Sequence, residues 1–179
     1  MQNKVDIYDG VLSKETLDNI NSFFIDRKEK LEWTTNQLFW PKYLNTHQGT
    51  ILIAMLDDSL KDTIYQELFN KNIISSPLEK TEGLFYQWLP GSSIAWHNDS
   101  RTNEEGWYGC TIYLTDRWDA NWGGAYAWKD TRGADQGKFI EPKFNRVVVL
   151  RDNVEHHVTT TSVFAPPRTT LQLFYKVAK

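Results

Sequence analysis

Two clusters of metal-ligating side chains stand in the second half of this chain, which has only four histidines. In His97-Asn98-Asp99 the outer residues are two apart, so on a strand both would project from one face toward a common ion. The second cluster is His156-His157, downstream in the chain. Two imidazoles and one carboxylate on adjacent positions of an octahedron suit Fe(II) and leave three positions for other ligands. The sequence therefore offers a candidate iron site.

The histidine pair leaves the third ligand open. On a strand, His156 would share a face with Val158, whereas His157 would project from the opposite face. Strand alternation by itself says only that both histidines cannot ligate together.

An arginine follows the second cluster. Arg168 stands twelve residues after His156 and begins the run Arg168-Thr169-Thr170-Leu171, in which Arg168 and Thr170 would face the same way. A guanidinium group with a neighbouring hydroxyl can bind a carboxylate at two points. A lone arginine is more often part of a surface ion pair, but its place after a metal triad favours an anion receptor.

Short strands are predicted to carry these residues. From Thr81 onward, runs rich in Val, Ile, Thr and aromatic residues alternate with Gly, Pro and Asp-Asn turns. The predicted strands are Leu84–Leu89, Gly109–Thr115, Ala125–Lys129, Arg146–Arg151 and Arg168–Lys176, and Asn153–Val158 opens another.

The first third of the chain reads as helical. Ser13 precedes apolar residues at helical spacing, and a second candidate helix follows Ser59. The aromatic-rich segment from Trp33 to Tyr43 has no assignment. Helices followed by many short strands predict a sandwich or barrel supported by helices.

Composition excludes several classes of protein. A chain of 179 residues with 40% hydrophobic and 24% charged residues can form one folded domain. A net charge of −3 argues against a nucleic-acid partner. A single cysteine, Cys110, makes no internal disulfide, and the longest apolar stretch, Ile51–Leu56, is too short for a membrane span. We therefore expect a cytoplasmic protein with no membrane partner.

The order of these motifs resembles the Fe(II)- and 2-oxoglutarate-dependent dioxygenases, in particular the prolyl 4-hydroxylase-like branch. The resemblance covers roughly residues 81–176. One departure is Thr115, where the family often has Asn. The matching pieces are Tyr86-Gln87-Trp88-Leu89-Pro90-Gly91, His97-Asn98-Asp99, Tyr113-Leu114-Thr115, Trp118, Gly123-Gly124, Pro142, Asn145 to Leu150, His156-His157-Val158 and Arg168-Thr169-Thr170-Leu171.

The resemblance implies a mainly β fold with supporting helices (α+β). Its core would be a double-stranded β-helix, which is jelly-roll-like, with the N-terminal helices packed on one sheet. We expect a single domain over residues 1–179, with 1–80 as helical support and 81–179 as the catalytic core.

It also implies a ligand set and cofactors. His97, Asp99 and His156 would hold Fe(II), because the family pattern His-x-Val places His156 and Val158 on the inward face. The cosubstrates would be 2-oxoglutarate and O2, with ascorbate as a further candidate cofactor.

The cosubstrate would be held by a second group of residues. Arg168 would pair with the distal carboxylate of 2-oxoglutarate, with Thr170 or Tyr113 as the hydroxyl partner. Tyr86 or Trp88 would line the pocket. The loops 100–107 and 129–138 are polar and contain Gly, and they flank the strands that carry the candidate ligands, so they are either substrate lids or plain solvated loops.

The activity implied is hydroxylation of a C–H bond, coupled to oxidative decarboxylation of 2-oxoglutarate to succinate and CO2. The branch favours a prolyl residue of a peptide or protein, although other small-molecule substrates stay open. Two alternatives use a similar barrel. A cupin-like metal enzyme would need a further His or Glu ligand, and a non-catalytic jelly-roll module could use its tryptophans to bind sugars.

Overall fold

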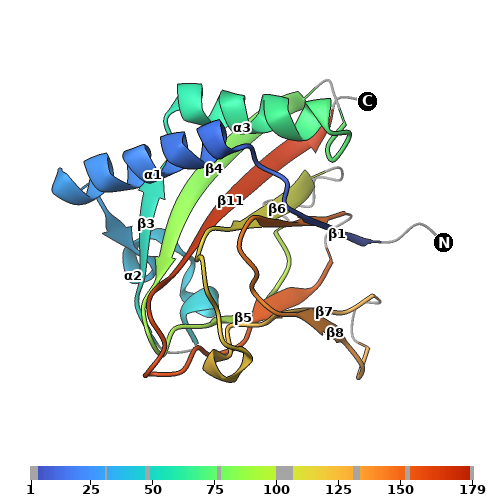
Figure 1. The fold of residues 1–179 in the computed structure, drawn as a ribbon. Helices are drawn as coiled ribbons and strands as arrows, with labels where there is room; N and C mark the ends of the chain where they lie inside the picture. The colour runs from blue at the N-terminus through green and yellow to red at the C-terminus, as the bar shows by residue number, and fades with distance from the viewer. Residues whose placement is uncertain are drawn as a thin grey trace.

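The computed structural model consists of two antiparallel sheets and a layer of helices (Figure 1). It describes residues 4–30, 32–46, 49–75, 78–99, 107–130, 134–151 and 154–177. The helices are α1 (Lys14–Glu29), α2 (Asn36–Phe39) and α3 (Asp58–Asn70), with short 3-10 turns η1 (Lys42–Thr46) and η2 (Ala120–Trp122).

Eleven strands form the two sheets in the described part of the chain. The larger sheet holds β1 (Val5–Asp9), β2 (Thr34–Thr35), β3 (Ile51–Met55), β4 (Leu78–Trp88), β6 (Trp107–Tyr113), β9 (Arg146–Leu150) and β11 (Arg168–Val177), in the order β1-β9-β6-β11-β4-β3-β2. The smaller sheet holds β5 (Ile94–His97), β7 (Tyr126–Trp128), β8 (Lys138–Ile140) and β10 (His156–Val158), in the order β5-β10-β7-β8. The predicted jelly-roll-like fold is confirmed.

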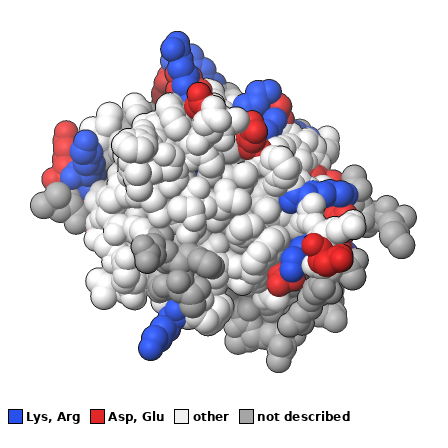
Figure 2. All heavy atoms as spheres, turned by 90° about the horizontal axis from the view of Figure 1, so that it is seen from below, with Lys and Arg blue, Asp and Glu red and all other residues white. Residues whose placement is uncertain are grey.

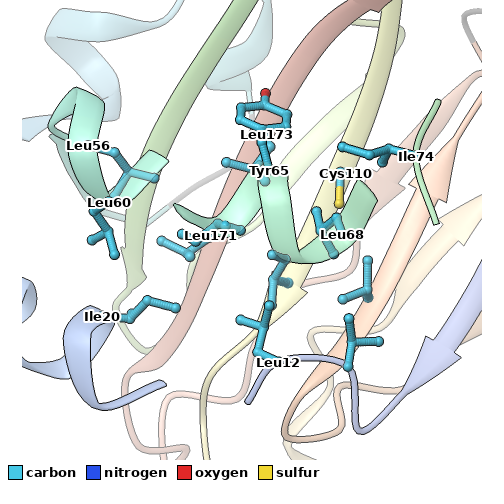
Figure 3. Packing of buried hydrophobic residues seen from close by; sticks show 14 of the residues in the cluster. Leu12, Ile20, Leu56, Leu60, Tyr65, Leu68, Ile74, Cys110, Leu171 and Leu173 are labelled. Atoms are coloured by element: carbon cyan, nitrogen blue, oxygen red, sulfur yellow. The ribbon is translucent and has the colours of Figure 1, made fainter. Parts of the chain in front are cut away.

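Helices α1 and α3 cover the outer face of the larger sheet (Figure 1). Each begins at a capping side chain: the Ser13 hydroxyl accepts from the Thr16 N–H, and the Asp57 carboxylate accepts from the Leu60 N–H. The second helix therefore begins at Asp58, not after Ser59. Their apolar faces meet β11 through residues such as Leu171 and Leu173 (Figure 3).

Strand alternation divides β11 between two cores. Leu171, Leu173 and Tyr175 face the helices, whereas Arg168, Thr170, Gln172 and Phe174 line a cavity between the sheets. The larger sheet therefore turns its polar positions inward, toward the smaller sheet.

The expectation that residues 1–80 are helical support is wrong in part. Strand β1 pairs with β9, and β3 pairs with β4, so the N-terminal third extends the larger sheet at both edges. The run Ile51–Met55 is a short apolar stretch, which periodicity cannot distinguish from a buried helical turn. The predicted strands are present, with ends shifted by up to six residues, whereas β1, β2, β3, β5 and β8 were not predicted.

The surface opposite α1 and α3 has few charged side chains at its centre (Figure 2). Acidic and basic groups lie mostly together near its rim, which agrees with the small net charge of the chain. Within the described ranges, no helix is both long and apolar enough to cross a membrane.

Candidate metal and cosubstrate site

His97, Asp99 and His156 come together at one end of the smaller sheet. Strands β5 and β10 are neighbours, and His97 lies directly opposite His156 in their register. The ligand atoms of the three side chains all lie within 4.8 Å of one another. Asp99 Oδ1 is 3.5 Å from His97 Nε2, and Asp99 Oδ2 is 3.7 Å from His156 Nε2. This arrangement could hold one metal ion.

Backbone carbonyl groups fix the orientation of both imidazoles. His97 Nδ1 donates to the Ala95 carbonyl at 2.8 Å, and His156 Nδ1 donates to the Val154 carbonyl at 2.9 Å. Each ring is thereby held in the tautomer whose Nε2 lone pair points toward Asp99. In both cases the acceptor is the carbonyl group two residues before the histidine, so the two imidazoles are oriented in the same way.

The two histidines differ in their affinity for protons. Burial lowers the pKa of His156 to about 4, so this imidazole is neutral and ready to ligate. Burial acts in the same direction on His97, but the hydrogen bond and charge of Asp99 outweigh it and raise the pKa of His97. A metal ion therefore competes with a proton at His97.

Strand β6 passes directly behind the Asp99 carboxylate. A Cβ atom at Gly109 would lie only 2.7 Å from Asp99 Oδ2, so a larger residue would collide with the carboxylate. The absence of a side chain at Gly109 lets Asp99 occupy the position between the two imidazoles.

Gly109→Ala is expected to weaken Mn(II) binding by about tenfold or more, as is typical when the support of a metal ligand is disturbed. The colliding atom is the end of a side chain, so the carboxylate can turn aside and the melting temperature should change little. Cys110→Ala is the matched control, because Cys110 faces the helices. Equal metal affinity in Gly109→Ala and the parent would contradict this role.

A cavity of about 470 Å³ extends from the cluster into the space between the sheets. The residues predicted to hold the cosubstrate all line it: Tyr86, Trp88, Tyr113, Arg168 and Thr170. The sequence left a choice between Tyr86 and Trp88, and the structure places both side chains on the cavity wall.

Arg168 is a buried cation, with 1% of its surface exposed. One guanidinium N–H donates to the Gly124 carbonyl at 2.5 Å, and the guanidinium carbon lies 4.6 Å from the Trp88 ring centre. Burial lowers the pKa of Arg168 to about 10, so the group stays charged at neutral pH. Its Nε atom has no hydrogen-bond partner among the described residues. A buried, incompletely bonded cation of this kind is suited to a carboxylate ligand.

Two hydroxyl groups flank this cation. The Thr170 hydroxyl accepts a hydrogen bond from Trp88 Nε1 at 3.0 Å. The hydroxyl proton of Thr170 is therefore directed away from Trp88 and is available to a ligand. The Tyr113 hydroxyl is buried and unpaired within the described part of the chain, and burial raises its pKa to about 12, so it remains a donor. Both candidates for the hydroxyl partner of Arg168 therefore face the cavity.

Residues 83–176 match the family model described as the 2OG-Fe(II) oxygenase superfamily. This chain belongs to that superfamily. A search of curated protein sequences finds no match. The resemblance stated from the sequence is confirmed, and the protein is an oxidoreductase that uses Fe(II) and 2-oxoglutarate. The cupin-like and sugar-binding alternatives are set aside.

Several solved oxygenases share the fold of this chain at low sequence identity. A Pseudomonas putida prolyl-4-hydroxylase superimposes with a TM-score of 0.74 at 17% identity, covering 99% of this chain and 95% of the other. A Trichoplax adhaerens prolyl hydroxylase, in complex with a hypoxia inducible factor peptide fragment, gives 0.71 at 17% identity over 98% and 84%. HygX from Streptomyces hygroscopicus, with nickel, 2-oxoglutarate and hygromycin B bound, gives 0.66 at 10% identity over 98% and 84%.

The side chains of this oxygenase fit both groups that its family uses. Two imidazoles that present Nε2, together with one carboxylate, form a donor set suited to Fe(II). Arg168 lines the same cavity and is a buried cation suited to a carboxylate group of 2-oxoglutarate. Cys110 does not compete for the metal, because it packs in the helix-facing core, where burial raises the pKa of its thiol to about 12.

The second histidine of the pair lies outside the cavity. The His157 ring packs against Trp96 with ring centres 4.1 Å apart and planes inclined by 32°, and Lys129 Nζ lies 4.7 Å from the centre of the Trp96 ring. The geometry thus favours His156 as the inward member, as the His-x-Val pattern predicted.

In this oxygenase, His156→Ala should lose both Mn(II) binding and turnover, whereas His157→Ala should keep most of each. The physical reason is that, of the two adjacent histidines, His156 directs its Nε2 toward Asp99, whereas the His157 ring packs against Trp96. Titration with Mn(II) and succinate release measure the two effects. The reverse pattern would move the third ligand to His157 and would imply another register at the irregularity between His156 and Val158.

Sequence reasoning missed two parts of the site. Tyr126, whose ring stacks on His156, lies on a predicted strand, and strand alternation counted from Trp128 could have placed it inward. The segment of α2 and η1, which had no assignment, supplies Phe39, Trp40 and Tyr43 to the cavity wall. Of the predicted lids, 100–106 and 131–133 lie outside the described residues, and a lid role for these loops stays a prediction.

Proposed function

We propose that this oxygenase hydroxylates a prolyl residue of a peptide or protein, with 2-oxoglutarate as cosubstrate. His97, Asp99 and His156 are the proposed iron ligands, and Arg168 is the proposed receptor for the distal carboxylate. The observation that supports this assignment is that one cavity contains the His-Asp-His cluster and a buried cation.

The bound iron would supply the activation of O2 that couples decarboxylation of 2-oxoglutarate to hydroxylation of a C–H bond. The chain's own residues position the reactants. Arg168 and the hydroxyls of Thr170 and Tyr113 hold one end of the cosubstrate, and Trp88 orients the Thr170 hydroxyl. The surrounding aromatic side chains exclude water, which strengthens the charged contacts within.

The wall of the cavity supports a neutral, compact substrate group. Phe39, Trp40 and Tyr43 add three aromatic rings to it. Apart from Arg168 and the three proposed iron ligands, the described residues that line the cavity are uncharged. The pyrrolidine ring of a prolyl residue is uncharged and packs well on aromatic faces. Two of the three similar structures described above carry the name prolyl hydroxylase, whereas HygX is a complex with hygromycin B, so the fold alone does not select the substrate.

The test is succinate release from 2-oxoglutarate under Fe(II) and O2, with a panel of proline-containing peptides. Each peptide is paired with its proline-to-alanine version, and free proline and neutral small molecules complete the panel. Expected is succinate release that depends on the proline, together with a mass gain of one oxygen atom in the peptide. Equal release with the alanine peptides, or oxygen gained only by a small molecule, would overturn the prolyl assignment.

A further inference from the structure

A buried phenol in the cavity has no role in the proposed function. Tyr126 of β7 lines the cavity and is only 2% exposed. Its hydroxyl is fully buried and finds no hydrogen-bond partner among the residues the structure describes. Buried polar groups in native proteins are nearly always bonded, so an unpaired one at a cavity wall indicates a donor awaiting a ligand.

The position of this phenol associates it with the metal end of the cavity. The Tyr126 ring lies nearly parallel to the ring of His156, with centres 5.2 Å apart and planes inclined by 16°. Tyr126 lines the same cavity as His97, Asp99 and His156. A phenol keeps its proton at neutral pH, so the Tyr126 hydroxyl can act as a donor.

The unpaired buried donors on the cavity wall divide into two groups. Among the described lining residues they are Arg168, Tyr113 and Tyr126. The Arg168 guanidinium lies 5.7 Å from the Tyr113 ring centre, so these two donors serve the same end of a ligand. Tyr126 instead packs against His156.

We propose that the Tyr126 hydroxyl donates a hydrogen bond to the 2-oxo acid end of 2-oxoglutarate, the end opposite the carboxylate proposed to bind Arg168. This inference rests on the proposed function. 2-Oxoglutarate is a dianion with two polar ends, and Arg168 with Tyr113 and Thr170 can satisfy only the distal one. At the other end, a carboxylate oxygen that faces the protein needs a donor, and a charge-assisted bond from a phenol suits it. Tyr126 is thus a cosubstrate-binding residue as well as a support for the His156 ring.

The two roles of Tyr126 are separable by substitution. Tyr126→Phe keeps the ring on His156 and removes only the hydroxyl. Mn(II) affinity without 2-oxoglutarate should therefore equal that of the parent. Tyr108→Phe is the matched control, because Tyr108 stacks on Tyr175 on the helix side of the sheet. Melting temperatures of all variants verify that each is folded.

The experiment measures binding to the Mn(II)-loaded full chain, without O2, by water-proton relaxation, which detects weak ligands. The ligands are 2-oxoglutarate and 2-oxopentanoate, which has the 2-oxo acid end but no distal carboxylate. We expect Tyr126→Phe to raise the dissociation constants of both acids by about tenfold, as for the loss of one hydrogen bond to a charged group. Arg168→Met should weaken 2-oxoglutarate alone, and Tyr108→Phe should weaken neither.

Each contrary outcome has a distinct meaning. Unchanged binding of both acids by Tyr126→Phe, or a loss confined to 2-oxoglutarate, would overturn the assignment of the hydroxyl to the 2-oxo acid end. A loss of Mn(II) affinity in Tyr126→Phe would also overturn it, because the hydroxyl would then act through the metal. Failure of the parent to bind 2-oxoglutarate would instead overturn the proposed function itself.

Discussion

Asp99→Ala is expected to lose more than about a hundredfold in Mn(II) or Fe(II) affinity, while the parent binds close to one ion. Asp99 provides the sole carboxylate of the described cluster, and its two oxygens lie 3.5 and 3.7 Å from the two imidazole nitrogens. Removal of a direct ligand should cost more than the ten- to hundredfold typical of groups that merely support one. Calorimetric titration with Mn(II) provides the measurement.

A control separates this effect from a general loss of negative charge. Asp116→Ala removes an exposed carboxylate outside the cavity lining and should bind Mn(II) like the parent. If Asp99→Ala also bound Mn(II) like the parent, the assignment of the metal cluster would be wrong.

The second large effect is expected at Arg168. Arg168→Ala should raise the dissociation constant of 2-oxoglutarate thirtyfold or more and leave Mn(II) binding nearly intact. Loss of one partner from a desolvated charge pair costs about 2–5 kcal/mol, and about 1.4 kcal/mol corresponds to a factor of ten. Arg168→Lys keeps the charge but not the planar fork, so its effect should be intermediate. The measurement is titration of 2-oxoglutarate into the Mn(II)-loaded variants.

Arg168→Met tests whether such a loss reflects unfolding. The methionine side chain can occupy the space of the arginine stem, and it removes a buried cation whose pKa no described carboxylate supports. Burial of an unpaired charge is costly, so its removal relieves the folded protein of that cost. We therefore expect a melting temperature no lower than that of the parent, together with lost 2-oxoglutarate binding. Unchanged binding in Arg168→Met and Arg168→Ala would show that another residue holds the distal carboxylate.

Most of the strands that carry the site could be predicted because their alternation is regular, whereas β5, which carries His97, was not among the predicted strands. On β11, Arg168 and Thr170 lie inward and Leu171 outward, as period-two reasoning requires. The same rule predicted that His97 and Asp99 lie together, as they do, although Asp99 stands two residues beyond the end of β5. The residue types and their order were thus enough to predict which polar side chains on or next to a strand face the site.

Contacts between distant segments could not be predicted in this way. The hydrogen bond from Trp88 to Thr170 depends on the pairing of β4 with β11, and the clearance at Gly109 depends on β6 passing behind Asp99. Neither relation leaves a local pattern in the sequence. Strand β3 was missed for another reason, since five apolar residues carry too little periodicity to identify an element.

The division of the site between the two sheets links cofactor binding to local unfolding. His97 and His156 belong to β5 and β10, which have four and three residues, whereas Arg168 belongs to β11, which has ten. Short strands with few hydrogen bonds open more readily than long central ones, so the smaller sheet should exchange its amide protons first. A molecule bound to the metal and to Arg168 at once joins the two layers. Each opening of the smaller sheet must then break that connection, so the cosubstrate acts as a crosslink that slows exchange in β5 and β10 far more than in β11.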